Sequence, residues 1–420
     1  MSTDQQPSRS VLSRRGMLAA GGAAILGAAG GFVLASGKDA SVPTTSAPPA
    51  PATSPPPTAE PGVPAAPVIL PFYGAHQAGV ETEPALFQTF VGLDLISPTR
   101  KNAEATMRLV TDDAARLTQG QSALADTQPE LALNADRLTI SVGLGHSLFE
   151  RIGLADRIPE QFPVIPRFRT DAFEEPWSGT DLLLQVGATD PLTLAHTLRM
   201  LTKDLSTLAR VRWSQPGFRS NAPASMGVAS RRNLMGQVEA THFPAPGSEQ
   251  FATVVWIDDG PDWVVGGTVL VLRRIRMLLD TWDILDRPVQ ETVMGRSLST
   301  GQLLGDGADD GVSPFDAVDD NGLPVIPADA HIRVARADSL EGVMMRRPYN
   351  YDSGMHKGTN DVGLLFAAYT RDPRTSFIPT QRRLARGDAF QRWISTVGSA
   401  TYVLPGGVAE GDFLAQGLFA

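Results

Sequence analysis

Two polar segments of the chain gather residue types that can bind a ligand, move a proton and stabilise a negative charge. Residues 231–242 contain Glu239, whose carboxyl group can accept a proton and return it. Residues 331–351 contain His331 and, further along, the Arg346-Arg347 pair. A guanidinium stays charged and presents a fork of donors, so it suits an anionic partner. These segments are therefore the first candidates for a functional site.

Histidine and cysteine usage narrows the metal chemistry that is open to the chain. It has six histidines, His76, His146, His196, His242, His331 and His356. A histidine taken alone is more often an inert core or surface residue than a metal ligand. Cysteine is absent, which excludes disulfides, thiolate-ligated haem, iron–sulfur clusters, zinc–cysteine sites and a lipid-modified cysteine.

Residues 231–242 and 331–351 resemble the two haem-pocket segments of dye-decolourising (DyP-type) peroxidases. In that family a Gly-x-x-Asp-Gly run supplies a distal acid. An Ala-His-Ile-Arg-like run supplies the proximal haem ligand, and an arginine pair further along supplies the distal arginine. The resemblance extends from about residue 69 to the C-terminus and includes residues 138–143, 181–185, 274–277, 363–366 and 375–384.

The resemblance implies one haem b per chain, with His331 as the proximal ligand of the haem iron. The second ring nitrogen of His331 would donate to a carboxylate, which the sequence does not identify. Arg346 would stabilise the charge that develops as the O–O bond of peroxide breaks. Alternatively, Arg346 binds a haem propionate or forms a surface pair with Arg347. By carry-over, the haem contacts are Ala240, Thr241, His242, Arg336, Ala337, Asp338 and Arg346.

The distal motif departs from the family pattern. Glu239 stands where the family has Asp and is longer by one bond, ~1.5 Å. Ala240 replaces a glycine, which strains the backbone if that position needs a positive φ. His242 is a substitute distal base, a sixth iron ligand, a propionate contact or a loop residue without a role. Arg346 follows His331 by only 15 positions, so we expect a shortened loop between them.

The N-terminus predicts export. Residues 1–36 contain a twin-arginine pair, Arg14-Arg15, before an uncharged Ala/Gly-rich run, which is typical of a Tat signal. An uncleaved membrane anchor is the alternative. Residues 37–66 are rich in Pro, Ala, Ser and Thr and read as an extended tether. We therefore expect a periplasmic, wall-associated or secreted protein.

The alternation of predicted strands and helices in the rest of the chain suits an α+β fold with ferredoxin-like units. The resemblance implies that two such domains stand in tandem, at residues 67–225 and 226–420. The resemblance adds antiparallel sheets with helices, of the dimeric α+β barrel type. Hydrophobic periodicity predicts strands at 87–95, 137–143, 182–186, 251–257, 267–276 and 362–369. It predicts helices at 99–118, 191–208, 277–285 and 386–395.

The expected function is that of an exported haem b peroxidase, with hydrogen peroxide and a small organic reductant (dyes, phenolics or porphyrinogens) as substrates. The alternatives are a haem deferrochelatase that works with iron-uptake components and a haem-free structural relative. The net charge of −9 and the lack of a basic stripe argue against a nucleic-acid partner. A homodimer is left open.

Overall fold

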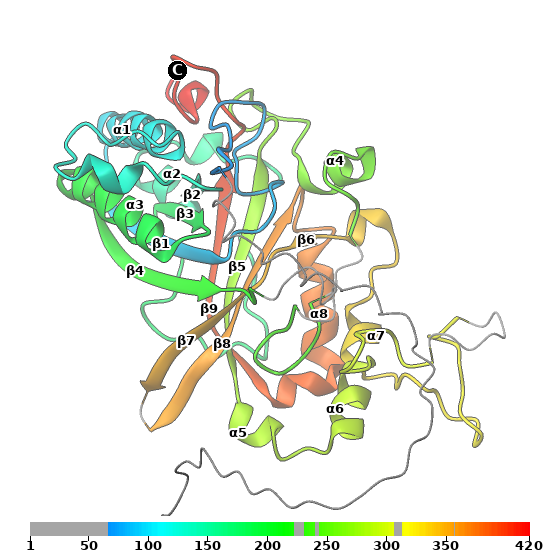
Figure 1. Cartoon of the computed structure of the whole chain (residues 1–420). Helices are drawn as coiled ribbons and strands as arrows, with labels where there is room; N and C mark the ends of the chain where they lie inside the picture. The colour runs from blue at the N-terminus through cyan, green and yellow to red at the C-terminus, as the bar shows by residue number, and fades with distance from the viewer. Residues whose placement is uncertain (1–65, 222–230, 240–242, 306–312, 357) are drawn as a thin grey trace, which may run out of the picture. The chain divides into compact units, whose positions relative to one another are not determined.

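The computed structural model describes residues 66–221, 231–239, 243–305, 313–356 and 358–420, which are coloured in Figure 1. The expected signal segment and the tether up to residue 65 lie outside the described residues. Among the residues described, no helix is both long enough and apolar enough to cross a membrane.

The N-terminal half is a four-stranded sheet with two long helices on one face (Figure 1). Its strands pair antiparallel in the order β2-β3-β1-β4. This is the ferredoxin-like unit expected from the sequence. Its elements are β1 (Phe87–Leu95), α1 (Arg100–Thr118), β2 (Thr139–Gly145), α2 (His146–Arg151), β3 (Leu182–Ala188), α3 (Pro191–Asp204) and β4 (Ala209–Phe218).

Local sequence explains where these elements begin. The Thr99 hydroxyl accepts from the backbone N–H of Asn102 and caps α1. Asp190 caps α3 in the same way, and Pro191 occupies the first turn, where a missing N–H is harmless. Every residue of β2 and β3 is buried, which explains their continuous apolar runs.

The C-terminal half repeats the strand order of the N-terminal half. Its main strands run antiparallel in the order β7-β8-β5-β9, which corresponds position by position to β2-β3-β1-β4. A helix precedes the last strand in both halves. The elements are β5 (Thr268–Met277), β7 (Tyr349–His356), β8 (Thr359–Thr370), α8 (Phe377–Gly387) and β9 (Ile394–Leu404).

The two sheets join into one closed ring. Leu144 of β2 pairs with Val403 of β9, and Phe218 of β4 pairs with Asn350 of β7. A cluster of buried side chains draws on strands of both halves, including Phe90, Trp213, Tyr351, Tyr369 and Tyr402. The barrel-like antiparallel α+β architecture predicted from the sequence is therefore confirmed.

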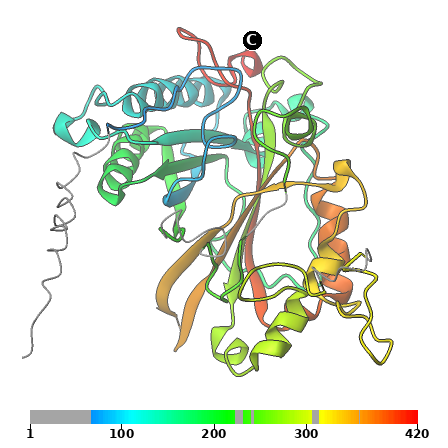
Figure 2. The ribbon, with the colours of Figure 1, turned by 45° about the vertical axis from the view of Figure 1, so that its right-hand side comes forward.

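The C-terminal half also contains shorter elements. They are α4 (Glu249–Val255), α5 (Leu279–Trp282), α6 (Arg287–Met294), α7 (His331–Ala335), the short strand β6 (Met345–Arg346) and the 3-10 turn Ala389–Arg392. Figures 1 and 2 show α7 and α8 beside each other, and the two helices are in contact.

Three local predictions were wrong. Residues 251–257 were expected to form a strand, but most of them lie in α4, whose buried residues Phe251, Val254 and Val255 follow helical spacing. A short apolar run does not distinguish a buried strand from a buried helix.

The last predicted helix was placed too late. Residues 386–395 were expected to be helical, but α8 ends at Gly387 and β9 begins at Ile394. Pro379 lies in the first turn of α8, where its missing N–H breaks no helical hydrogen bond. The helix predicted at 277–285 also shrinks, since β5 extends to Met277 and α5 covers only Leu279–Trp282.

Candidate functional site

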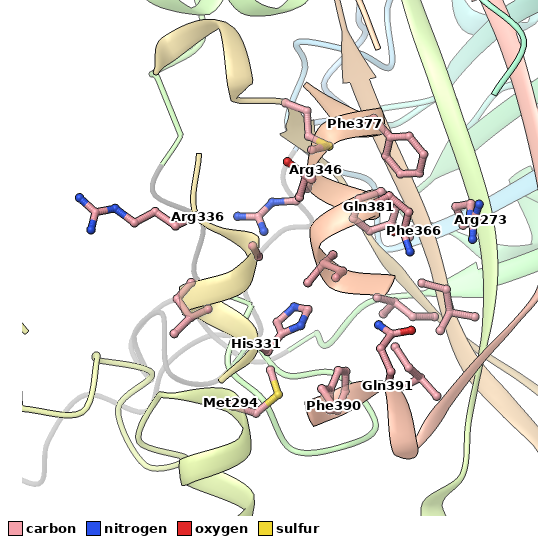
Figure 3. Close-up of a pocket in the computed structure, with 18 of the residues that line it drawn as sticks. Arg273, Met294, His331, Arg336, Arg346, Phe366, Phe377, Gln381, Phe390 and Gln391 are labelled. Atoms are coloured by element: carbon pink, nitrogen blue, oxygen red, sulfur yellow. The ribbon is translucent and has the colours of Figure 1, made fainter. Parts of the chain in front are cut away.

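A cavity of about 340 Å³ lies between the outer face of the C-terminal strands and the helices α7 and α8 (Figure 3). Side chains alternate along a strand, so Arg273 and Ile275 of β5 face the cavity while Leu270 and Leu272 pack inside the ring. Most of the wall is apolar, with Met294, Ile332, Leu364, Phe366, Phe377 and Phe390 among its residues. Such a cavity suits a flat apolar ligand.

His331 lines this cavity from the first residue of α7. Its Nδ1 lies 2.8 Å from Oδ2 of Asp388, and its side chain is 26% exposed. A carboxylate only accepts hydrogen bonds, so Nδ1 must carry the proton that it donates. This arrangement fixes the tautomer and leaves Nε2 as the ring nitrogen with a free lone pair.

Asp388 is held rigidly behind His331. It follows the last residue of α8, and its side chain is completely buried. Its Oδ1 accepts the backbone N–H of Phe390 at 2.9 Å, and its Oδ2 accepts from Nε2 of Gln391 at 3.2 Å. The carboxylate is thus satisfied on both oxygens and oriented toward the imidazole.

Arginines give the cavity a positive character. Arg296 and Arg346 line it, and Arg336 lies at its rim with the guanidinium over the Phe315 ring, directed away from the cavity (Figure 3). Arg346 is an exposed residue that lines the cavity. The surrounding protein still desolvates its guanidinium, and this desolvation, together with the charge on Arg296, lowers the pKa of Arg346. Among the described lining residues there is no carboxylate.

The two arginines of the Arg346-Arg347 pair point in opposite directions. Arg347 is buried, and its guanidinium donates to the backbone carbonyls of Gly79, Val80 and Thr82. It therefore links the second half to the segment that precedes β1. A surface pair of the two arginines, one of the alternatives drawn from the sequence, is not what the structure contains.

Glu239 does not line the cavity. Its side chain is only 10% exposed, and its Oε2 lies 4.0 Å from Nη2 of Arg219. Its other oxygen, Oε1, is buried and has no hydrogen-bond partner among the described residues. Burial raises the pKa of Glu239 to about 7, while the charge on Arg219 opposes this.

The remaining predicted contacts divide into three groups. Ala337 lines the cavity, whereas Asp338 does not. Ala240, Thr241 and His242 lie outside the described residues. The sequence reasoning did not find Arg296, Asp388, Gln381 or Gln391. Asp388 is 57 residues from His331, so no local motif connects them.

The residues of the cavity fit a haem group. An imidazole with a free Nε2 and a buried carboxylate behind Nδ1 is the usual arrangement for a proximal ligand. The apolar walls match the macrocycle, and Arg346, which meets no carboxylate among the described lining residues, matches a propionate or an anionic ligand.

Comparisons with known proteins show the family of the chain. Residues 77–219 match the N-terminal domain of Dyp-type peroxidases, and residues 230–409 match the C-terminal domain. The chain is 38% identical over 437 residues to the dye-decolorizing peroxidase of Thermobifida fusca, covering 99% of both chains. It is 34% identical to the deferrochelatase of Escherichia coli K12, over 83% of this chain and 86% of that protein.

A solved structure has the same fold. The DyP-type peroxidase from Cellulomonas bogoriensis superposes with a TM-score of 0.79 at 43% identity, covering 84% of this chain and 98% of that one. The resemblance stated from the sequence is confirmed, and so is haem b as the cofactor. The chain belongs to the Dyp-type peroxidase family.

Proposed function

We propose that this chain is an exported haem b peroxidase that reduces hydrogen peroxide while it oxidises small organic donors. The observation that carries the proposal is the His331–Asp388 hydrogen bond beside a cavity that contains arginines and, in its described lining, no carboxylate. A carboxylate partner makes the imidazole a stronger ligand and keeps it in one orientation. The 38% sequence identity to a dye-decolorizing peroxidase supports the same activity.

Each side chain has a specific task in this proposal. His331 would bind the haem iron through Nε2, with Asp388 holding the proton of Nδ1 in place. The bound haem supplies the electron transfer between peroxide and the organic donor. Arg346 would orient peroxide and stabilise the negative charge on its departing oxygen, because its guanidinium meets no carboxylate among the described residues that line the cavity.

Glu239 would carry the proton in this proposal. Glu239 has a pKa of about 7 because it is buried, which suits a group that must both accept and release a proton near neutral pH. It would have to turn from Arg219 toward the cavity to do so. Since Glu239 and Ala240 depart from the family motif, we expect Glu239→Asp with Ala240→Gly to raise the rate with peroxide by roughly tenfold or more. A slower double variant would point to His242 as the base.

Haem titration of two histidine variants tests the site. We expect His331→Ala to lose most of the Soret absorbance and to keep the far-ultraviolet circular dichroism of the unchanged protein. His356→Ala is the matched control, because His356 is an exposed residue at the end of β7. Full haem uptake by His331→Ala would remove His331 from the role of ligand.

A haem deferrochelatase working with iron-uptake components is the second candidate. It is supported by the Escherichia coli relative that carries the name deferrochelatase. The same cavity would hold haem in both cases, so the products distinguish the two functions. Release of iron-free porphyrin, measured by its fluorescence, supports the second candidate; oxidation of a dye by peroxide with intact haem supports the first.

A further inference from the structure

We propose that Gln391 is a positioning residue that weakens the hydrogen bond between Asp388 and His331 and thereby raises the reduction potential of the bound haem. This inference rests on the proposed function, because it requires His331 to bind iron. It assigns a role to a side chain that neither touches the iron ligand directly nor belongs to a sequence motif.

One oxygen of Asp388 serves two donors. Its Oδ2 accepts from Nδ1 of His331 at 2.8 Å and from Nε2 of Gln391 at 3.2 Å. Its Oδ1 is occupied by the backbone N–H of Phe390 at 2.9 Å. A carboxylate cannot donate, so the amide of Gln391 must be the donor. The two side chains therefore share the electron density of a single oxygen.

The local fold holds Gln391 in this place. Asp388 caps the turn Ala389–Arg392 through the Phe390 N–H, and Gln391 follows three residues after Asp388 in the same turn. Gln391 also lines the cavity and is half-buried. Figure 3 shows its carboxamide on the cavity side of this turn, near Phe390. Its amide thus reaches from the cavity to a carboxylate that is completely buried.

Sharing Oδ2 limits how strongly Asp388 polarises the imidazole. A hydrogen bond to a charged acceptor is strong, and a second donor on the same oxygen withdraws part of its charge. With Gln391 present, His331 is therefore a weaker electron donor than it would be if Asp388 served it alone. A weaker donor stabilises the ferric state less, so the reduction potential lies higher.

Removal of the Gln391 amide is expected to shift the midpoint potential of the haem. In Gln391→Leu, Oδ2 serves only His331, which becomes more anionic and favours ferric iron. Loss of a residue that hydrogen-bonds to a metal ligand typically changes metal affinity or activity roughly tenfold to a hundredfold. At the lower end, a tenfold change in the ratio of ferric to ferrous stability corresponds to ~59 mV for a one-electron couple. We therefore expect the midpoint potential to fall by about this amount.

Gln381 provides the matched control. It is also a glutamine that lines the cavity, but it lies on α8 and makes no hydrogen bond to Asp388. Gln381→Leu removes the same amide from the same cavity. A less polar cavity disfavours the charged ferric haem, so this variant should leave the potential unchanged or raise it. The reduction potential is thus expected to fall in Gln391→Leu and not to fall in Gln381→Leu.

The experiment is a potentiometric titration of the haem-loaded full chain, followed by its absorption spectrum, for the unchanged protein and both variants. Gln391→Ile serves as a second variant if Gln391→Leu does not fold. A fall specific to Gln391 supports the inference. An unchanged or raised potential in the Gln391 variants, with haem bound, overturns it. If the unchanged chain does not bind haem at all, the proposed function fails first, and this inference fails with it.

Discussion

Replacing Asp388 with asparagine tests the core of the site, because it changes chemistry but hardly changes shape. In the present structure Oδ2 of Asp388 accepts the Nδ1 proton of His331, and Oδ1 accepts the Phe390 N–H. Asparagine can still accept from Phe390 through its carbonyl oxygen. Its amide nitrogen then faces Nδ1 of His331, where two donors would meet. The imidazole must move its proton to Nε2, which is the atom that would bind iron.

The expected losses of haem affinity and of stability follow from the hydrogen bonds that each Asp388 variant lacks. An outer-shell partner of a histidine ligand is worth roughly tenfold to a hundredfold in metal affinity, ~1.4 to 2.7 kcal/mol. Asp388→Ala should also lower stability, because it leaves the buried N–H of Phe390 unsatisfied at a cost of about 1–3 kcal/mol. Asparagine avoids this second cost. Haem affinity should therefore fall in both variants, whereas the melting temperature should fall mainly in Asp388→Ala.

Titration of the haem-free protein with haemin, read from the Soret band, measures the affinity, and a thermal melt measures the stability. Asp329→Asn is the matched control: it removes an exposed carboxylate two residues before His331 that makes no side-chain hydrogen bond to it. Wild-type haem affinity in Asp388→Asn would show that the tautomer of His331 does not govern binding.

Three further predictions concern other parts of the chain. Burial raises the pKa of Glu239 from 4.5 to about 7, so in the folded state it holds its proton over a range in which the unfolded chain has released it. Stability should therefore fall by up to ~3 kcal/mol as the pH rises from 4.5 to 7. Urea unfolding of Glu239→Gln should lack this loss, and a parallel pH profile would contradict the assignment. Arg346→Ala should lower kcat with peroxide roughly a hundredfold or more, and clearly more than Arg336→Ala, whose guanidinium points out of the cavity; equal losses would speak against a distal role. Lysine at both Arg14 and Arg15 should retain the protein inside the cell, as shown by fractionation, and unchanged export would mean that the signal was misread.

Much of the fold could be predicted, because several elements carry strong local signals. The strand predicted at 87–95 coincides with β1, and the helix predicted at 99–118 begins one residue later, after the Thr99 cap. The errors lie where local signals compete. The apolar run at 251–257 suits either structure, and the packing of Phe251 and Val254 in the core decided for a helix.

The site was less predictable, because its key contacts cross long distances in the sequence. His331 and Arg346 stand in recognisable runs and do line the cavity. Asp388 had no such signal, since its role depends on where α8 ends relative to α7. The direction of the Glu239 side chain, toward Arg219, is set by tertiary packing, and a motif of residue types contains no such information.

The closed ring also has a consequence for how the chain acquires its structure. β9 lies between β5 and β2, so it supplies the pairing that joins the two halves at that seam. It is also the last strand among the described residues, ending at Leu404. The ring therefore cannot close until Leu404 has been synthesised. Strand pairs so distant in sequence form slowly, and a product truncated before β9 would expose two unpaired strand edges, which invite aggregation.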